Sequence, residues 1–241
     1  MRVHSPFSSH SVHTLETEAP LAAGPWERAL AQPAFRWQAV LLVLLLAVVV
    51  GVAVPPFFLY IQQRPGTLLP DPLLALLPCR NVATPIFVLM YGASVLGMGW
   101  LGRHPALLLR GLWAYLLLTL LRMSTIWLLP LVPPLDLVPM PDPFMSLIFH
   151  VPVEGAITKD LFFSGHTSTV ALLALAVRGR AWRSVLAVMA LLVGVLVLVQ
   201  RVHYSYDVLA APLFAGLAYW AAGFITQVGP DADEAAAART L

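Results

Sequence analysis

Charged residues and cysteine are scarce in this sequence, and both shortages narrow the class of protein. Only 11% of the 241 residues are charged and 59% are hydrophobic, with a mean hydropathy of +0.82. A water-soluble domain of this length needs a charged surface, so the composition indicates a protein that is solvated by a lipid bilayer. The single cysteine, Cys79, excludes an intrachain disulfide framework and a metal site built from cysteines.

Net charge and lysine are scarce as well. The formal net charge of +2 is too small to indicate a nucleic-acid partner. Lys159 is the only lysine, and this arginine bias, with abundant Ala, Leu and Val, points to a GC-rich bacterial genome. No internal repeat is evident, and the first apolar run begins too late and is too long for a signal peptide.

Six apolar runs predict an all-α, polytopic membrane protein with about six transmembrane helices in one domain, residues 35–228. The runs cover residues 38–60, 84–101, 106–129, 163–177, 184–200 and 207–226. A span needs about 20 residues, and the fourth run fits least well because polar residues crowd its start. Residues 1–34 are polar and predict a disordered tail with a short interfacial helix around Trp26 to Leu30. Residues 229–241 are expected to form a second tail.

The placement of arginine predicts the orientation. Arginines precede the first run and fill the links between runs two and three and between runs four and five: Arg28, Arg36, Arg103, Arg110, Arg178, Arg180 and Arg183. By the positive-inside rule these segments and both termini are cytoplasmic. Two polar motifs, at residues 164–167 and 203–207, then reach the same non-cytoplasmic face.

The motif at 203–207 places His203 four residues before Asp207. On a helix these positions share a face, so Asp207 could fix the tautomer of His203 and leave its other ring nitrogen free to attack an electrophile. The alternative is an ordinary helix start with Ser205 or Asp207 as N-cap. Tyr204 inside the motif and Arg201 before it are candidate substrate-binding residues.

The motif at 164–167 precedes a run of helix formers. Ser164 and Gly165 would begin a helix whose free N–H groups form an anion site, and His166 in its first turn could protonate a leaving oxygen. The alternative is an ordinary Ser N-cap. Two such motifs on one membrane face favour a functional site, because ionisable groups beside apolar spans are otherwise disfavoured.

Arg122 lies inside the third run, about two turns from its outer end. A charge at that depth costs a few kcal/mol, so it needs an anionic partner, either a carboxylate or a substrate phosphate. We count Arg122 as a candidate phosphate ligand, with a structural ion pair as the alternative. Asp160, Lys159 and Arg80 are weaker candidates, as is Arg201, because charges at span ends commonly serve as interfacial anchors.

Four elements resemble the sphingomyelin synthase family, a branch of the type-2 phosphatidic acid phosphatase superfamily. They are Leu69-Pro70-Asp71, the stretch from Leu121-Arg122 through Thr125 to Leu129-Pro130, Asp160-Leu-Phe-Phe-Ser-Gly-His166-Thr, and His203-Tyr-Ser-Tyr-Asp207-Val. The departures are Lys159 for a glycine, Leu121 for a tyrosine and Ser205 for a threonine. They leave headgroup and acceptor specificity open.

The resemblance implies a bacterial member that transfers phosphoethanolamine or phosphocholine from a glycerophospholipid to ceramide or diacylglycerol through a phosphohistidine. It implies His203, His166 and Asp207 as catalytic residues, with Arg122, Ser164, Gly165, Asp160, Tyr204 and Arg201 binding the phosphate or substrate. We expect no metal and no cofactor, lipid partners, a periplasm-facing site in the inner membrane, and no nucleic acid; a homo-oligomer stays open.

Two other functions compete with this one. A lipid phosphatase or phospholipase C-like hydrolase would use the same triad with water as acceptor. The phosphatase branch fits less well, because its Lys-x6-Arg-Pro element is not found and Val197 stands where an arginine is expected six residues before His203. A non-catalytic transporter or scaffold would have no need of two imidazoles and a carboxylate on one membrane face.

Overall fold

The computed structural model describes residues 24–141 and 157–226, and the regular structure within these ranges is helical apart from one isolated bridge between Thr67 and Leu131. The elements are α1 (Pro25–Ala31), α2 (Pro33–Leu46), the π-helix η1 (Ala47–Ala53), α3 (Val54–Gln63), α4 (Pro72–Ala75), α5 (Ala83–Leu101), α6 (Pro105–Leu128), α8 (Gly165–Ala176), α9 (Arg180–Val199) and α10 (Ser205–Thr226). The predicted all-α membrane fold is confirmed.

Within the described ranges, five helices are long and apolar enough to cross a membrane: the continuous helix Pro33–Gln63, α5, α6, α9 and α10. The fourth apolar run differs from the prediction, because it forms α8, which has only 12 residues. That length is about 18 Å at 1.5 Å per residue, against a hydrocarbon layer of about 30 Å.

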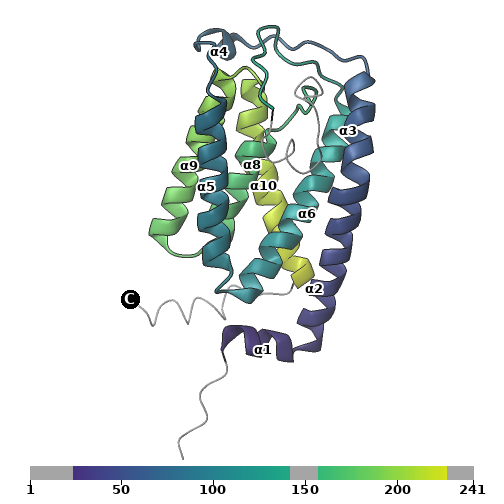
Figure 1. Cartoon of the computed structure of the whole chain (residues 1–241), viewed down its shortest axis with the longest axis vertical. Coiled ribbons are helices and arrows are strands. Elements are labelled where there is room, and N and C mark those ends of the chain that lie inside the picture. The colour runs from purple at the N-terminus through teal and green to yellow at the C-terminus, as the bar shows by residue number, and fades with distance from the viewer. Residues whose placement is uncertain (1–23, 142–156, 227–241) are drawn as a thin grey trace, which may run out of the picture.

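Protein surrounds the short helix α8. It packs against α5, α6, α9 and α10, and most of its residues are buried. In Figure 1, α8 lies between α9 and α10 within the bundle. Because these neighbours take the place of lipid, the polar residues at the start of α8 are tolerated.

The first long helix, formed by α2, η1 and α3, lies along the outside of the bundle (Figure 1). Its only buried residues are Leu42 and Ile61. The π-helical stretch η1 directly precedes Pro55 and Pro56, which carry no N–H and whose rings clash with carbonyls one turn back. A local change in the hydrogen-bond register before the prolines lets the helix continue.

The bundle has two distinct ends. At one, which we call the α1 end, α1 runs across the bundle (Figure 1), and the Trp26 indole donates to the Gly102 carbonyl in the turn between α5 and α6, with N–O 2.7 Å. The short helix predicted around Trp26 to Leu30 is present as α1, and the start of α2 also lies within the segment predicted as a tail, residues 1–34. Residues 1–23 and the second predicted tail, 229–241, lie outside the described ranges.

At the other end, which we call the α4 end, three loops are joined to one another by hydrogen bonds. The Thr67 amide donates to the Pro130 carbonyl at 2.8 Å, and the Arg80 amide donates to the Val199 carbonyl at 3.0 Å. The buried Gln200 side chain donates to the Val138 carbonyl at 3.2 Å and accepts from the Val82 amide. These bonds gather the loops at 64–82, 129–139 and 199–204 over the start of α8.

Candidate active site

His203 and Asp207 meet at the start of α10. The Nδ1 atom of His203 lies 3.1 Å from Oδ2 of Asp207, and both side chains are buried. The same oxygen accepts a hydrogen bond from the Tyr204 amide at 3.1 Å. The carboxylate thus holds both the imidazole and the turn that carries it, which leaves Nε2 of His203 as the nitrogen available for chemistry.

The two histidine motifs are joined through the backbone. The Ser164 amide donates to the Asp207 carbonyl at 3.1 Å, which places the start of α8 directly beside the first turn of α10. Ser164 is the N-cap of α8, and its hydroxyl oxygen accepts from the Thr167 amide at 3.3 Å. The expected Ser cap is therefore present, and it lies in the same site as the His203–Asp207 pair.

His166, in the first turn of α8, lies next to His203. The centroids of the two imidazole rings are 6.3 Å apart and their planes are inclined by 66°. Phe87 of α5 closes another side of His166, with ring centroids 6.2 Å apart. At this separation, one phosphoryl group can contact both imidazoles, so the structure brings together the two histidines that the sequence proposed.

Arg122 has the carboxylate partner that its depth required. Its Nε donates to Oδ1 of Asp160 at 2.9 Å, and its Nη2 donates to Oδ2 of the same carboxylate. The guanidinium also lies against Gly165, where an added Cβ would overlap with Nη1. Arg122 therefore forms a bidentate ion pair and at the same time places a positive charge at the N-terminus of α8.

The ion pair affects the ionisation of Asp160. Partial burial raises the pKa of this carboxyl, but the charge and hydrogen bonds of Arg122 outweigh that effect, and the pKa of Asp160 lies below its ordinary value. Asp160 therefore stays anionic at neutral pH. An anionic Asp160 can hold the guanidinium in a fixed orientation beside His166.

Tyr204 and Arg201 have other partners. The Tyr204 hydroxyl donates to the Val132 carbonyl at 2.9 Å and accepts from the Leu69 amide at 3.3 Å, and burial raises its pKa. Arg201 donates to the Leu77 carbonyl at 2.8 Å. These contacts tie neighbouring loops together, and the substrate-binding role of the two residues stays a prediction.

Asp71, which belongs to the Leu69-Pro70-Asp71 element, binds the first residue of α10 and is a further candidate for the site. Its carboxylate accepts from the Ser205 amide at 2.6 Å and the Ser205 hydroxyl at 2.9 Å, and it also caps α4 through the Leu74 amide at 2.9 Å. Burial acts to raise the pKa of Asp71, but these bonds outweigh it and lower the pKa. Asp71 thus caps α10 from outside the helix, next to His203.

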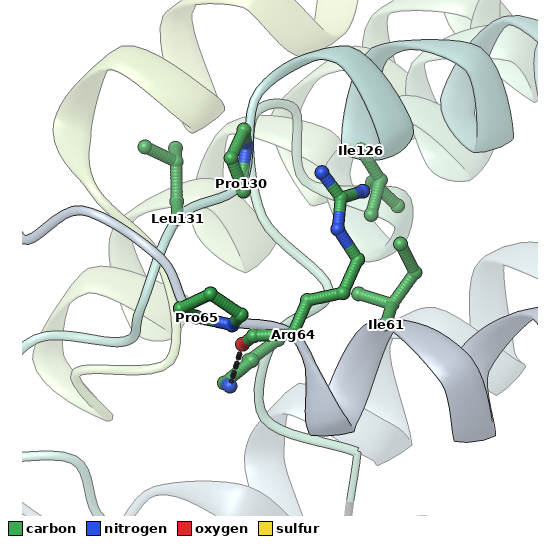
Figure 2. A pocket seen from close by; sticks show the side chains of 7 residues that line it. Ile61, Arg64, Pro65, Ile126, Pro130 and Leu131 are labelled. Atoms are coloured by element: carbon green, nitrogen blue, oxygen red, sulfur yellow. Dashed lines mark hydrogen bonds between the residues drawn. The ribbon is translucent and has the colours of Figure 1, made fainter.

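A small hollow lies beside the site, between the end of α3 and the loop that follows α6 (Figure 2). Its volume of about 10 Å³ is close to the space of one water molecule. Lys159, which precedes Asp160, lines it and donates to the Arg64 carbonyl. Within the described ranges, no group of three or more His, Cys, Asp or Glu side chains could hold a metal ion.

Comparison with known proteins finds a family-model match over the part of the chain that carries both histidine motifs. Residues 159–223 match the family model described as PAP2 superfamily C-terminal, and this segment holds Asp160, both histidines and Asp207. No curated protein and no solved structure matches the chain. The match supports the superfamily part of the predicted resemblance, the type-2 phosphatidic acid phosphatases, whose members are generally phosphatases or phosphotransferases.

Proposed function

We propose that the protein is a membrane enzyme that transfers a phospho-headgroup from a glycerophospholipid to ceramide or a related lipid alcohol through a phosphohistidine. One observation supports this most directly. His203, paired with Asp207, lies beside His166 at the N-terminus of α8, where Arg122 adds a positive charge. That set contains a nucleophile, its orienting carboxylate, an acid and an anion site, which are the groups that phosphoryl transfer needs.

In the first half-reaction, the lone pair of His203 Nε2 attacks phosphorus. The bond from phosphorus to the diacylglycerol oxygen breaks, and His166, in its protonated form, gives that oxygen its proton. Arg122 and the first amides of α8 stabilise the charge that builds on the phosphoryl oxygens. Diacylglycerol leaves, and the phospho-headgroup stays on His203 while Asp207 stabilises the cationic ring.

The second half-reaction reverses these roles. Neutral His166 takes the proton from the acceptor hydroxyl, whose oxygen attacks phosphorus as the bond to Nε2 breaks. His203 and the protonated His166 are then restored, so protons balance over the cycle.

The site lies at the α4 end, which the arginine distribution assigns to the non-cytoplasmic leaflet, and in a bacterium this leaflet faces the periplasm.

A hydrolase is the second candidate, because water could replace the lipid alcohol with the same triad. Val197, at the position where the phosphatase branch has an arginine, is buried in the hydrophobic core and carries no charge. Arg122 of α6 supplies a guanidinium from a different helix. Val197 therefore fits the phosphatase branch poorly. Arg122 belongs to the stretch that resembles the third-span element of the transferase family, and the two positions together favour the transferase.

The test is turnover of labelled phosphatidylethanolamine, phosphatidylcholine and phosphatidic acid by purified protein, with and without ceramide, followed by lipid mass spectrometry. A transferase gives a ceramide phospho-headgroup product that depends on added ceramide. A hydrolase gives diacylglycerol and a free phosphorylated product, or removes phosphate from phosphatidic acid, without any acceptor. No product with any of these lipids would contradict both enzymatic functions.

The triad can be tested in the same assay. We expect His203→Ala and His166→Ala each to abolish turnover while the protein stays monodisperse. Asp207→Asn should leave residual activity, reduced by on the order of 10⁴-fold, because the ring keeps its nucleophilic nitrogen but loses the anionic orienter. Near wild-type turnover in His203→Ala would contradict the proposed mechanism.

A further inference from the structure

The outer end of the first long helix is tied to the loop that leads into the active site. Gln62, in the last turn of α3, accepts hydrogen bonds at Oε1 from the Thr158 and Lys159 amides, each at 3.2 Å. Its Nε2 donates to the Thr158 hydroxyl at 2.7 Å. One side chain therefore makes three hydrogen bonds to two consecutive residues that are about 96 positions away in sequence. We call these three bonds, from Gln62 to Thr158 and Lys159, the clasp.

Two more bonds strengthen this junction. Lys159 donates through Nζ to the Arg64 carbonyl, a contact drawn in Figure 2, and Arg64 donates to the Trp127 carbonyl at 2.9 Å. By contrast, the helix that carries Gln62 buries few of its own residues against the bundle. Hydrogen bonds therefore contribute much of the attachment at this end, where apolar packing is sparse.

Thr158 and Lys159, the residues that the clasp holds, directly precede the residues that form the anion site. Asp160 follows Lys159 and holds Nε and Nη2 of Arg122 through both carboxylate oxygens. Arg122 in turn lies against Gly165, one residue before His166. Fixing the backbone at 158–159 thus restricts where the Asp160 carboxylate can lie, and the carboxylate restricts the guanidinium.

We propose that Gln62 is a positioning residue, which sets the place of Arg122 in the active site by clasping the chain before Asp160. In this role Gln62 acts through Asp160 and Arg122, because its hydrogen bonds hold the two residues that precede Asp160. The inference rests on the proposed function for its kinetic consequence, but the clasp itself is a property of the fold. An amide is also costly in an apolar span unless it is bonded, which gives position 62 a reason to hold one.

Three variants test the proposal. Gln62→Leu removes every clasp bond, Gln62→Glu keeps the acceptor oxygens for both amides, and Gln63→Leu changes an exposed neighbour in the same way. We expect Gln62→Leu to lower kcat and weaken inhibition by vanadate by about 10- to 100-fold with little change in KM, since displacement of a positioned group by about 1 Å can have that effect. Gln62→Glu should keep most of the wild-type kcat and vanadate affinity, and Gln63→Leu should match wild type in both.

Amide hydrogen exchange tests the clasp independently of lipid turnover. In Gln62→Leu, amide exchange over residues 158–164 should be faster by about tenfold, while the core of α9 is unchanged. Fast exchange confined to 158–159, or wild-type kcat and vanadate affinity in a well-folded Gln62→Leu, would overturn the positioning role. If wild type turns over no lipid, the proposed function fails, and the exchange pattern over 158–164 still decides whether the clasp is real.

Discussion

At the residue scale, the position of Arg122 fits both of the roles that its place in the sequence left as alternatives. It forms an ion pair with Asp160, as a structural arginine would, through Nε and Nη2. Its Nη1 lies at Gly165, as expected of an arginine that binds a phosphoryl group. A guanidinium can do both because its donors lie on separate edges of one rigid plane, which an ammonium does not have.

Arg122→Lys should therefore affect anion binding and turnover together. Vanadate adopts the five-coordinate geometry of phosphoryl transfer, so we expect it to inhibit competitively and to bind between His203 and His166. In Arg122→Lys the ammonium can pair with Asp160 or reach the anion, and both vanadate affinity and kcat should fall by at least about tenfold. Unchanged inhibition of a purified, monodisperse variant would remove Arg122 from the site and leave it a structural role.

Gly165 is the second residue whose identity the site requires. Gly165→Ala should place a methyl group where the Arg122 guanidinium lies, and we expect loss of most turnover with a modest loss of stability, because the guanidinium must move. Gly99→Ala in α5 is the matched control, since nothing lies within 4 Å of an added Cβ there. Thermal unfolding and turnover of both variants give the measurement; equal turnover in the two would contradict the close approach of Arg122.

At the scale of elements, the site depends on the two helix starts that meet at its centre. α8 begins at a Ser164 cap, and α10 receives its cap from Asp71 in a distant loop. The Ser164 amide then joins the first turns of the two helices through the Asp207 carbonyl. α8 is too short to span the bilayer. Its packing within the bundle instead holds its N-terminal turn in place at the site.

The distant cap can be removed without touching the triad. Asp71→Ala loses the bonds to Ser205 and Leu74, and we expect a destabilisation of about 1–3 kcal/mol together with lower turnover, since His203 precedes the freed helix start. Asp71→Asn keeps one acceptor oxygen and should lose less. Asp136→Ala, at an exposed aspartate on the same end, is the control. Equal unfolding temperatures for Asp71→Ala and Asp136→Ala would show that this cap contributes little.

At the scale of the whole molecule, the arginines of the helix links and the two histidine motifs lie at opposite ends of the bundle. Arg103, Arg180 and Arg183 belong to links of the α1 end, whereas the histidines lie below the loops of the α4 end. If the positive-inside rule governs insertion, the α1 end is cytoplasmic and the chemistry takes place on the other face.

The native cysteine provides a direct test of this orientation. Cys79 is exposed and follows α4, so a membrane-impermeant maleimide should label it only from the non-cytoplasmic side. In a Cys79→Ser background, a cysteine at the exposed Arg180 should react only after the cytoplasmic face is opened, and one at Leu135, which is 85% exposed, should react from outside. The reverse pattern would invert the orientation and place the site in the cytoplasm.

The sequence by itself determined the class of fold and the pairing of His203 with Asp207. Apolar runs, arginine placement and the His203–Asp207 spacing are local properties, and they are enough to predict the helices, the membrane face of the two motifs and a hydrogen-bonded pair four residues apart. The contacts that complete the site are not local. Asp160 reaches Arg122 across 38 residues, Asp71 reaches Ser205 across 134, and Gln62 reaches Thr158 across 96.

Only the tertiary structure decided those partners, as well as the length of α8 and the loop-tying roles of Tyr204 and Arg201. A polar residue at the end of an apolar run has the same local signature whether it anchors a headgroup, caps a distant helix or holds a catalytic arginine. The physical difference lies in which unpaired amide or charge the fold brings within about 3 Å of it, and that depends on how the helices pack.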